Sequence, residues 1–325
     1  MNRSAKPNSE GGQPAGRAVL CNIGRAGDTI LRNAILDSVY QTYAEVTYLC
    51  GRGNVDLIRC DPRHSRVILF RNSLAGFGRI LKAAVRDRYD AYLDLKDHDS
   101  SVSLVLARVF RARSKTGVNR PRNRPFHHDT RGVWVPGLHK VEVMKLIAKA
   151  AGLRLGTFQP SLVCAPDSIH WFRQVHSPAE PFSLLNVSAT DPNRMWPAEK
   201  WIAYLKGIAL PDWPLLVNAV PADRELARHI CGALPRAKLI QPRHFMDVVA
   251  AVAAARLVLT VDTGVMHACS ALDVPIVVLA NGPEPIGEFA PLSTRRLVIQ
   301  ALAPRMLSNL TAEEAIAATR GRLPL

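Results

Sequence analysis

Short apolar runs alternate along the chain with longer stretches in which hydrophobic residues recur at helical spacing. In the first half, runs typical of strands occupy residues 18–23, 46–50, 67–70 and 91–95. Between the first two runs, a predicted helix over residues 28–43 carries on one face Ile30, Ala34, Leu36 and Val39. Strands that alternate with helices in this way predict βαβ units and a parallel sheet covered on both faces.

The second half of the chain repeats this pattern. We expect strands at residues 182–186, 215–219, 238–240, 256–261 and 275–280. We expect helices at residues 197–208, 222–233, 244–255, 264–272 and 311–320. Residues 111–139 show little apolar periodicity and are rich in Arg, Pro and His, which predicts long loops before a helix at 140–151.

A chain of 325 residues suits two domains of about 150 residues each. The pattern divides it into a disordered polar leader (1–16), an N-terminal Rossmann-like domain (17–160), a linker (161–180) and a C-terminal Rossmann-like domain (181–325). The predicted fold class is therefore α/β, with two doubly wound parallel sheets. We expect a ligand cleft at the carboxyl ends of their strands, where such folds bind ligands.

Composition indicates a soluble globular protein, because 48% of the residues are hydrophobic and 21% are charged. The leader lacks the apolar segment of a signal peptide, and no apolar run approaches the roughly 20 residues that span a bilayer. The six cysteines form no C-x-x-C pair, which favours reduced thiols and a cytoplasmic location. His267 and Cys269 lie close together without a second ligand pair, so we expect no metal site.

The net charge of +15 is unevenly distributed. Nine Lys and Arg residues but a single acid, Asp129, lie between Arg108 and Lys140. Such a cluster attracts nucleic acid, an anionic membrane surface or a phosphorylated substrate, and it is also consistent with a solvated surface of a basic protein. Aromatic residues make up only 6% of the chain and no nucleic-acid-binding motif is present, which disfavours nucleic acid.

Three stretches carry residues suited to chemistry. In "NIGRAGDTILRNAIL" (22–36), glycines such as Gly27 permit close backbone approach to a ligand, and Asp28 is either a catalytic acid–base group or a helix N-cap. In "LLNVSATDPNRMWPAEKWIAYL" (184–205), the loop residues Ser188, Thr190 and Arg194 either grip phosphate oxygens or make local turns.

The third stretch, "DTGVMH" (262–267), follows the apolar run ending at Val261 and opens a predicted helix. Asp262 sits at the end of the strand, and the unpaired N–H groups of Thr263, Gly264 and Val265 suit an anion at the helix N-terminus. His267, in the first turn, either donates to the same anion or is a buried histidine of the helix core.

Together, "RAGDTILRNAIL", "RMWPAEKW" and "TVDTGVMHACSALDVPIVVLANGPEP" resemble the hallmark stretches of glycosyltransferase family 9, the bacterial heptosyltransferases. The resemblance extends over residues 17–320. It implies the GT-B architecture, in which an N-terminal domain binds the acceptor and a C-terminal domain binds a nucleotide-sugar donor. It also implies that the last helix packs back toward the N-terminal domain.

The activity implied by the resemblance is transfer of heptose from ADP-heptose to a hydroxyl of a glycan acceptor, such as the lipopolysaccharide inner core. The reaction inverts the anomeric centre and needs neither a cofactor nor a bound metal. By the same resemblance, Asp28 is the general base, and the donor is bound by Ser188, Thr190, Arg194, Glu225, Asp262, Thr263, Gly264, Val265 and His267. Acceptor binding, or docking on the inner membrane leaflet, falls to Gly27, Arg111, Arg113, Arg120, Arg122 and Arg124.

The sequence departs from the family pattern at three places. Arg194 stands where many members carry lysine, Met266 replaces a small residue, and "NAVPADRE" replaces a Gly-rich stretch near which nucleotide base contacts are expected. Another nucleotide sugar, or a capsule, protein or small-molecule acceptor, is therefore an alternative. A non-catalytic anion- or nucleic-acid-binding protein is a second alternative, resting on charge alone.

Overall fold

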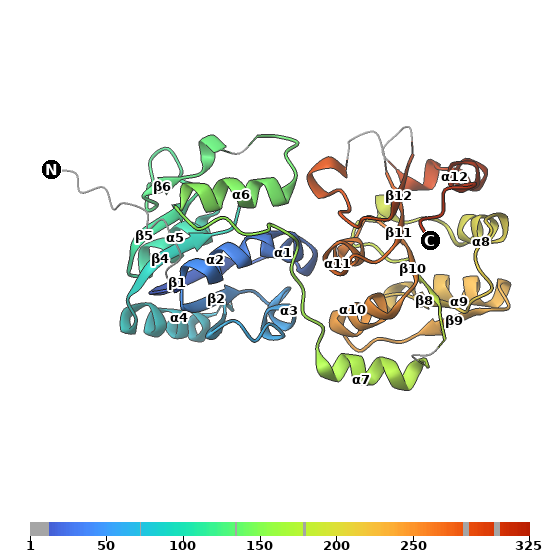
Figure 1. Ribbon diagram of the computed structural model, residues 1–325, viewed down its shortest axis with the longest axis horizontal. Coiled ribbons are helices and arrows are strands. Elements are labelled where there is room, and N and C mark those ends of the chain that lie inside the picture. Colours follow the sequence, from blue (N-terminus) through green and yellow to red (C-terminus); the bar gives the residue numbers. More distant parts are fainter. Residues whose placement is uncertain (1–12, 72, 134, 178–179, 282–285, 302–305) are drawn as a thin grey trace. The chain divides into compact units, whose positions relative to one another are not determined.

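The computed structural model describes residues 13–325 except 72, 134, 178–179, 282–285 and 302–305. The first twelve residues of the predicted leader and the "GPEP" of the third hallmark stretch therefore lie outside the described residues. The chain divides into two compact units, one ending at Ser161 (unit 1) and the other beginning at Leu162 (unit 2). Each unit is an α/β sandwich with a central sheet between helices (Figure 1).

Unit 1 contains a six-stranded parallel sheet with the order β3-β2-β1-β4-β5-β6. Its strands are β1 (Arg17–Asn22), β2 (Glu45–Cys50), β3 (Arg66–Leu69), β4 (Tyr89–Asp94), β5 (Ala112–Gly117) and β6 (His128–Asp129). The first four confirm the sequence pattern, but β5 and β6 correct the expectation of loops over 111–139. The sequence "ARSKTG" of β5 is almost free of apolar residues, and backbone pairing with β4 holds it in the sheet.

The helices of unit 1 are α1 (Ala26–Arg32), α2 (Leu36–Thr42), α3 (Val55–Arg59), α4 (Leu74–Arg86), α5 (Ser101–Val109) and α6 (Lys140–Ala150). The helix expected over 28–43 is present but is interrupted by a 3-10 turn, Asn33–Ile35, between α1 and α2. On one face of the sheet, α4 and α5 contact each other and share a core with Tyr92 and Phe110. Helix α6 contacts α1 and the 3-10 turn.

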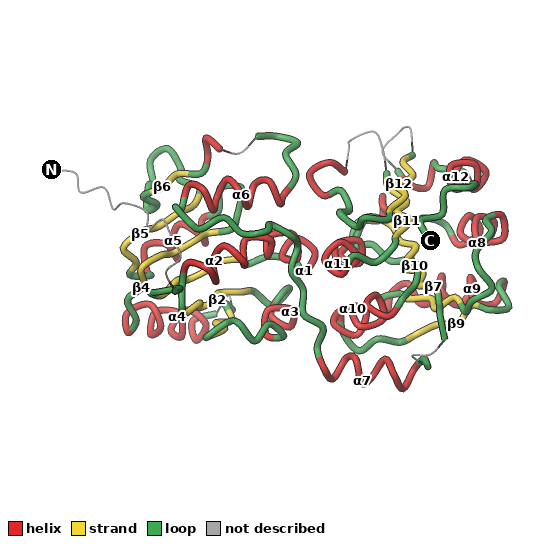
Figure 2. The backbone as a smooth tube through the Cα atoms, in the orientation of Figure 1, coloured by secondary structure: helices red, strands yellow, loops and turns green. Residues whose placement is uncertain are grey.

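Unit 2 repeats the topology with a second six-stranded parallel sheet, of order β12-β11-β10-β7-β8-β9 (Figure 2). Its strands are β7 (Ser183–Asn186), β8 (Leu215–Asn218), β9 (Ala237–Ile240), β10 (Leu257–Val261), β11 (Ile276–Ala280) and β12 (Arg296–Gln300). Every residue of β10 and β11 is buried, as expected for strands covered on both faces. The edge strand β12 was not predicted from sequence.

The helices of unit 2 are α7 (Pro166–Val175), α8 (Ala198–Gly207), α9 (Arg224–Ala233), α10 (Phe245–Ala254), α11 (Gly264–Leu272) and α12 (Ala312–Thr319). Helix α7 lies inside the expected linker 161–180 and packs on α10, and unit 2 begins at Leu162. Helix α12 packs on α8, where Thr319 hydrogen-bonds Tyr204 at 2.8 Å. Helix α12 also contacts β12 of its own unit, and its packing toward the N-terminal domain stays a prediction.

The "RMWPAEKW" stretch supplies the centre of the unit 2 core. The rings of Trp196 and Trp201 are both fully buried and meet edge to face at 5.0 Å between centroids. Trp196 Nε1 donates to the carbonyl of Leu310 at 2.9 Å, which ties the loop before α12 to the start of α8. The tryptophans of this hallmark stretch therefore have a structural role.

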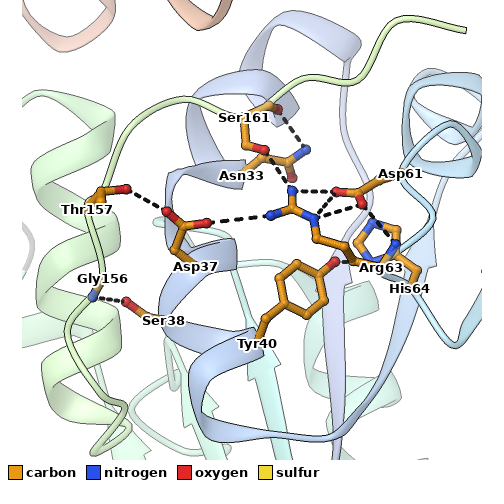
Figure 3. Close-up of polar contacts among 10 residues, drawn as sticks. All are labelled: Asn33, Asp37, Ser38, Tyr40, Asp61, Arg63, His64, Gly156, Thr157 and Ser161. Atoms are coloured by element: carbon orange, nitrogen blue, oxygen red, sulfur yellow. Dashed lines mark hydrogen bonds and ion pairs between the residues drawn. The ribbon is translucent and has the colours of Figure 1, made fainter. Parts of the chain in front are cut away.

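A polar network fastens the chain leading to Ser161 onto unit 1 (Figure 3). Gly156 N donates to Ser38 Oγ at 2.9 Å and Thr157 Oγ1 donates to Asp37 Oδ2 at 2.5 Å. At the end of the segment, Arg63 Nη2 donates to Ser161 Oγ at 2.9 Å. The guanidinium of Arg63 is held in place by a bidentate contact with Asp61 and by the Tyr40 ring, 4.7 Å below it.

His64 lies beside this network, and its neutral ring is half-buried. Its Nδ1 hydrogen-bonds the Tyr40 hydroxyl at 2.6 Å, and its Nε2 has no hydrogen-bond partner among the described residues. Burial lowers the pKa of His64 to about 4. Because the ordinary value is about 6.5, the unfolded chain binds a proton between roughly pH 6.5 and 4 that the folded chain does not bind.

We expect His64 to make the protein less stable as the pH falls through this range. Between pH 7 and pH 5 the wild-type free energy of unfolding should fall by about 2 kcal/mol more than that of a His64→Gln variant. Urea unfolding at the two pH values measures this difference. Equal losses of stability in the two proteins would contradict the assignment.

Candidate functional site

In unit 2, the structure brings Asp262 and Arg194 together from distant parts of the chain. Asp262 directly follows β10, and its side chain is only 8% exposed. Arg194 comes from the 3-10 turn Pro192–Arg194 after β7, and its Nη1 lies 3.0 Å from Asp262 Oδ2 and 3.3 Å from the Asp262 carbonyl. The two predicted donor residues therefore form one charged pair at the carboxyl ends of adjacent strands.

The two members of this pair shape each other's electrostatics. Burial raises the pKa of the Asp262 carboxyl, and the Arg194 guanidinium opposes that rise. The Arg194 side chain is 40% exposed, and its Nη2 makes no hydrogen bond with a described residue. Its Nε is enclosed and lies 4.0 Å from Asp191 Oδ2. Because the guanidinium is partly exposed and keeps N–H groups without an acceptor, Arg194 is suited to donate to an added anionic oxygen.

Helix α11 begins immediately after Asp262. Thr263 is its N-cap, and the Thr263 hydroxyl accepts from Val265 N at 3.3 Å. The first-turn N–H groups and the helix dipole make the start of α11 electropositive beside Arg194. Gly264 and Thr263 are half-buried, whereas the Val265 side chain is buried. Because the Val265 N–H donates to the cap, it is not the unpaired donor that the sequence predicted.

His267 and Met266 both lie on the buried side of α11. His267 is 5% exposed, with its ring centroid 6.2 Å from that of Phe289, which agrees with the interpretation of a buried histidine. Its contact with an anion stays a prediction. Met266 is fully buried, so its bulk belongs to the core and the departure from a small residue is a packing difference.

The remaining predicted donor residues are dispersed. Ser188 is buried, and its hydroxyl accepts from Val220 N at 2.9 Å, so it joins the loops that follow β7 and β8. Thr190 is exposed in the same loop as Arg194. Glu225, in the first turn of α9, has a side chain 86% exposed and is paired with Arg228. No hydrogen bond or ion pair among the described residues links Glu225 to the Asp262–Arg194 pair.

Asn186, which sequence reasoning missed, holds this site together. Its Nδ2 lies within hydrogen-bonding distance of the Ser188 carbonyl (3.1 Å), Thr260 Oγ1 (3.0 Å) and Thr263 Oγ1 (3.4 Å). Its Oδ1 accepts from Asn218 Nδ2 at 2.7 Å. The sequence signal was an asparagine ending two successive apolar runs, "LLN" and "LLVN".

In unit 1, Asp28 and Gly27 lie in the first turn of α1, at the carboxyl end of β1. The N-cap of α1 is Arg25, so the structure does not support Asp28 as the cap. The Asp28 carboxyl is partly exposed and has no hydrogen-bond or ion-pair partner among the described residues. It is therefore available to accept a proton from a bound hydroxyl.

A second group missed from sequence lies one helical turn beyond Asp28. Arg32 on α1 contacts Asp97 at 3.2 Å, and Lys140 at the start of α6 contacts the same carboxylate at 2.6 Å. Burial raises the pKa of Asp97, but the Lys140 hydrogen bond and Arg32 outweigh it and hold the pKa well below its ordinary value. With two cations around one acid, this cluster is electropositive next to Asp28.

Asn22, the last residue of β1, plays in unit 1 the role that Asn186 plays in unit 2. Its Nδ2 donates to Tyr48 Oη at 3.1 Å and to Thr29 Oγ1 at 3.3 Å, and its Oδ1 accepts from Arg32 at 3.3 Å. Asn54 donates to the Asn22 carbonyl at 2.7 Å. These bonds fix the start of α1, and with it Asp28, against the sheet.

The five predicted acceptor arginines are not gathered in one place. Arg111 and Arg113 are exposed at the amino end of β5, and Arg113 pairs with Asp90 at 3.4 Å. Arg120, Arg122 and Arg124 lie beyond its carboxyl end, where Arg120 donates to Ser101 Oγ at 2.9 Å. Arg120, Arg122 and Arg124 therefore lie, like Asp28, beyond the carboxyl ends of the strands.

Two general features complete the description. Among the described residues, no group of three or more His, Cys, Asp and Glu side chains is arranged to hold a metal ion. Within the same residues, none of the helices combines the length and apolar character needed to cross a bilayer.

Solved structures similar to this chain show its fold. The glycosyltransferase family 9 protein of Veillonella parvula superposes with a TM-score of 0.78 at 19% identity, covering 95% of this chain and 97% of that one. E. coli heptosyltransferase WaaC, solved with ADP-2-deoxy-2-fluoro heptose, superposes with a TM-score of 0.74 at 19% identity, covering 94% and 99%. E. coli ADP-heptose lps heptosyltransferase II gives 0.74 at 18% identity, covering 94% and 98%.

These similarities confirm the GT-B fold class, two Rossmann-like parallel-sheet domains. A search of the curated proteins finds no match to the chain. The model of glycosyltransferase family 9 (heptosyltransferase) matches residues 78–314, which include the Asp262–Arg194 pair and begin after Asp28. The chain is therefore a glycosyltransferase, a member of the heptosyltransferase family, glycosyltransferase family 9.

Proposed function

We propose that the enzyme transfers a heptose from ADP-heptose to a hydroxyl of an anionic glycan, such as the lipopolysaccharide inner core, on the cytoplasmic side of the membrane. The observation that carries the proposal is the Asp262–Arg194 pair at the N-terminus of α11. It brings together a guanidinium with N–H groups free to donate, the N–H groups of a helix start and a carboxylate. Diphosphate oxygens complement the donors, and sugar hydroxyls complement the carboxylate.

The proposed reaction is a single inverting displacement without a metal ion. Asp28 takes the proton of the acceptor hydroxyl as its oxygen bonds to the anomeric carbon of the sugar. The bond between that carbon and the diphosphate oxygen breaks, and the nucleoside diphosphate leaves with the bonding electrons. Arg194 and the start of α11 stabilise the negative charge that develops on the leaving diphosphate.

WaaC was solved with an ADP-heptose analogue, which supports ADP-heptose as donor for this chain. Another nucleotide sugar is the alternative, because "NAVPADRE" departs from the family pattern and Glu225 lies on the surface, paired with Arg228. The increase in Tm on thermal unfolding, measured with ADP-heptose and with UDP- and GDP-sugars, distinguishes ADP-heptose from another nucleotide sugar as the donor. The proposal requires the largest increase in Tm with ADP-heptose.

Replacing Asp28 by Asn should remove the base and leave the fold and the donor site intact. We expect kcat to fall by ~10²–10⁴-fold, with the Kd for ADP-heptose unchanged. Single-turnover transfer and calorimetric titration measure the two quantities. An Asp37→Asn variant, changed in the next helix, is the control and should retain kcat. Normal turnover by Asp28→Asn would disprove the assignment.

Replacing Arg194 by Ala should weaken donor binding by about 10–100-fold, since a hydrogen bond to a charged group contributes about 1.5–3 kcal/mol. The same change removes the cation that opposes the rise in the pKa of Asp262, so this carboxyl should titrate at higher pH in ¹³C NMR. Arg236→Ala, an exposed arginine paired with Asp212, is the matched control. Donor binding equal to wild type in Arg194→Ala would refute the diphosphate contact.

The two groups of basic residues around β5 should differ in their effect on the acceptor. Charge reversal of Arg120, Arg122 and Arg124 should lower kcat/KM for an anionic acceptor and leave it unchanged for a short neutral one. Reversal of Arg111 and Arg113, at the other end of the strand, should change neither value, because sites in such sheets lie at the carboxyl ends. Unchanged activity of the first variant on the anionic acceptor would rule out this role.

A further inference from the structure

Helix α4 carries an apolar stripe that its own unit covers only in part, where the Phe77 ring meets Phe70 edge to face at 5.5 Å. Phe77, Leu81 and Val85 recur at every fourth position and are 40%, 54% and 50% exposed. Residues spaced in this way share one face of a helix. A different face of α4, formed by Ile80, Ala83 and Ala84, is buried in the core of unit 1. In Figure 1, no other element of unit 1 lies on the outer side of α4.

A basic hollow of about 480 Å³ adjoins this helix. It is formed along the edge strand β3, and its charged lining consists of Arg59, Arg66, Arg71, Lys82 and Arg86. Arg66 is paired with Asp87 at 2.9 Å. The other four cations have no ion pair with any described residue, so the hollow has an uncompensated positive charge that suits anionic groups.

The stripe and the hollow are parts of one surface. Lys82 and Arg86 immediately follow Leu81 and Val85, so they lie about 100° further round the same helix. The start of α4 is fixed by the Ser73 cap and by Gly76, where an added Cβ would lie 2.1 Å from the Arg71 carbonyl. This close approach, possible only for glycine, holds Arg71 beside the first turn of α4.

An exposed apolar stripe beside unpaired cations complements a surface that is anionic outside and apolar a few ångströms deeper. An anionic bilayer has this structure, and amphipathic helices bind it with the apolar face at the acyl boundary and the cations at the headgroups. We propose that α4 docks unit 1 on an anionic phospholipid bilayer, with Phe77, Leu81 and Val85 inserted and lipid phosphates in the hollow. The family resemblance predicted docking on the inner membrane leaflet through the arginines of residues 111–124. The proposal assigns this contact to α4 and the hollow instead, and it does not depend on the identity of the sugar.

Co-sedimentation of the full chain with vesicles tests the proposal without any substrate. We expect binding to vesicles that contain phosphatidylglycerol and much weaker binding to pure phosphatidylcholine, with a steep decrease as NaCl is raised. Charge reversal of Arg71, Lys82 and Arg86 should weaken binding by about 100-fold or more, since each cation contributes about fivefold near an anionic surface. Replacing Phe77, Leu81 and Val85 together by Ser should weaken it by at least ~10-fold.

Matched controls come from the rest of the surface. Leu155, Val220 and Met306 are 67%, 49% and 45% exposed, and their joint replacement by Ser should leave vesicle binding unchanged. Charge reversal of the exposed Lys206, Lys238 and Arg320 reproduces the change in net charge away from α4 and should have little effect. Urea unfolding and protection by ADP-heptose in each variant verify that the fold and the donor site are intact.

Two results would overturn the proposal. One is equal binding of wild type and stripe variant to phosphatidylglycerol vesicles, or no binding by either. The other is a dimer, detected by analytical ultracentrifugation, that the stripe variant loses while vesicles do not bind, since the stripe would then be an interface between copies. In both cases, retained protection by ADP-heptose would show that the proposed donor site stands although docking has failed.

Discussion

The loops at both candidate sites depend on a buried asparagine at the end of a central strand. Where parallel strands end, buried backbone N–H and C=O groups need hydrogen-bond partners other than water. One amide side chain can bond several of these groups at once. Asn22 joins β1 to α1 and to the Tyr48 hydroxyl, and Asn186 joins β7 to the starts of the neighbouring loops. The carboxylates of the two candidate sites, Asp28 and Asp262, are therefore positioned by residues that do not themselves need to touch a substrate.

The candidate sites of the two units differ in how their charged side chains are paired. In unit 2 a single arginine faces a single buried acid and retains an unused N–H, which favours an added anion. In unit 1 two cations already share Asp97, whereas Asp28 is left without a partner. The first arrangement suits binding of a charged group and the second suits proton transfer, which agrees with assigning the donor to unit 2 and the base to unit 1.

The sequence predicted strands whose side chains are all buried, and it missed a strand that is held mainly by backbone pairing. Runs such as that of β10 are apolar throughout because both faces are covered, and they were predicted within a residue or two. The polar strand β5 is held by backbone hydrogen bonds to β4, so its side chains carry no signal. Asp262, Thr263 and Arg194 were predicted as donor-binding residues from two separate motifs, but their pairing was not. Asn186 was missed because an asparagine after an apolar run is typical of any turn.

The concentration of tryptophan in one unit makes the two units optically distinct. Trp196 and Trp201 are stacked edge to face in the core of unit 2, and Trp171 and Trp213 belong to the same unit. Unit 1 instead holds five of the six tyrosines, with Trp134 outside the described residues. Tryptophan emission, excited at the red edge of the absorption band, therefore reports mainly on unit 2. Tyrosine emission reports mainly on unit 1. The unfolding of each half can thus be observed in the intact chain without a label.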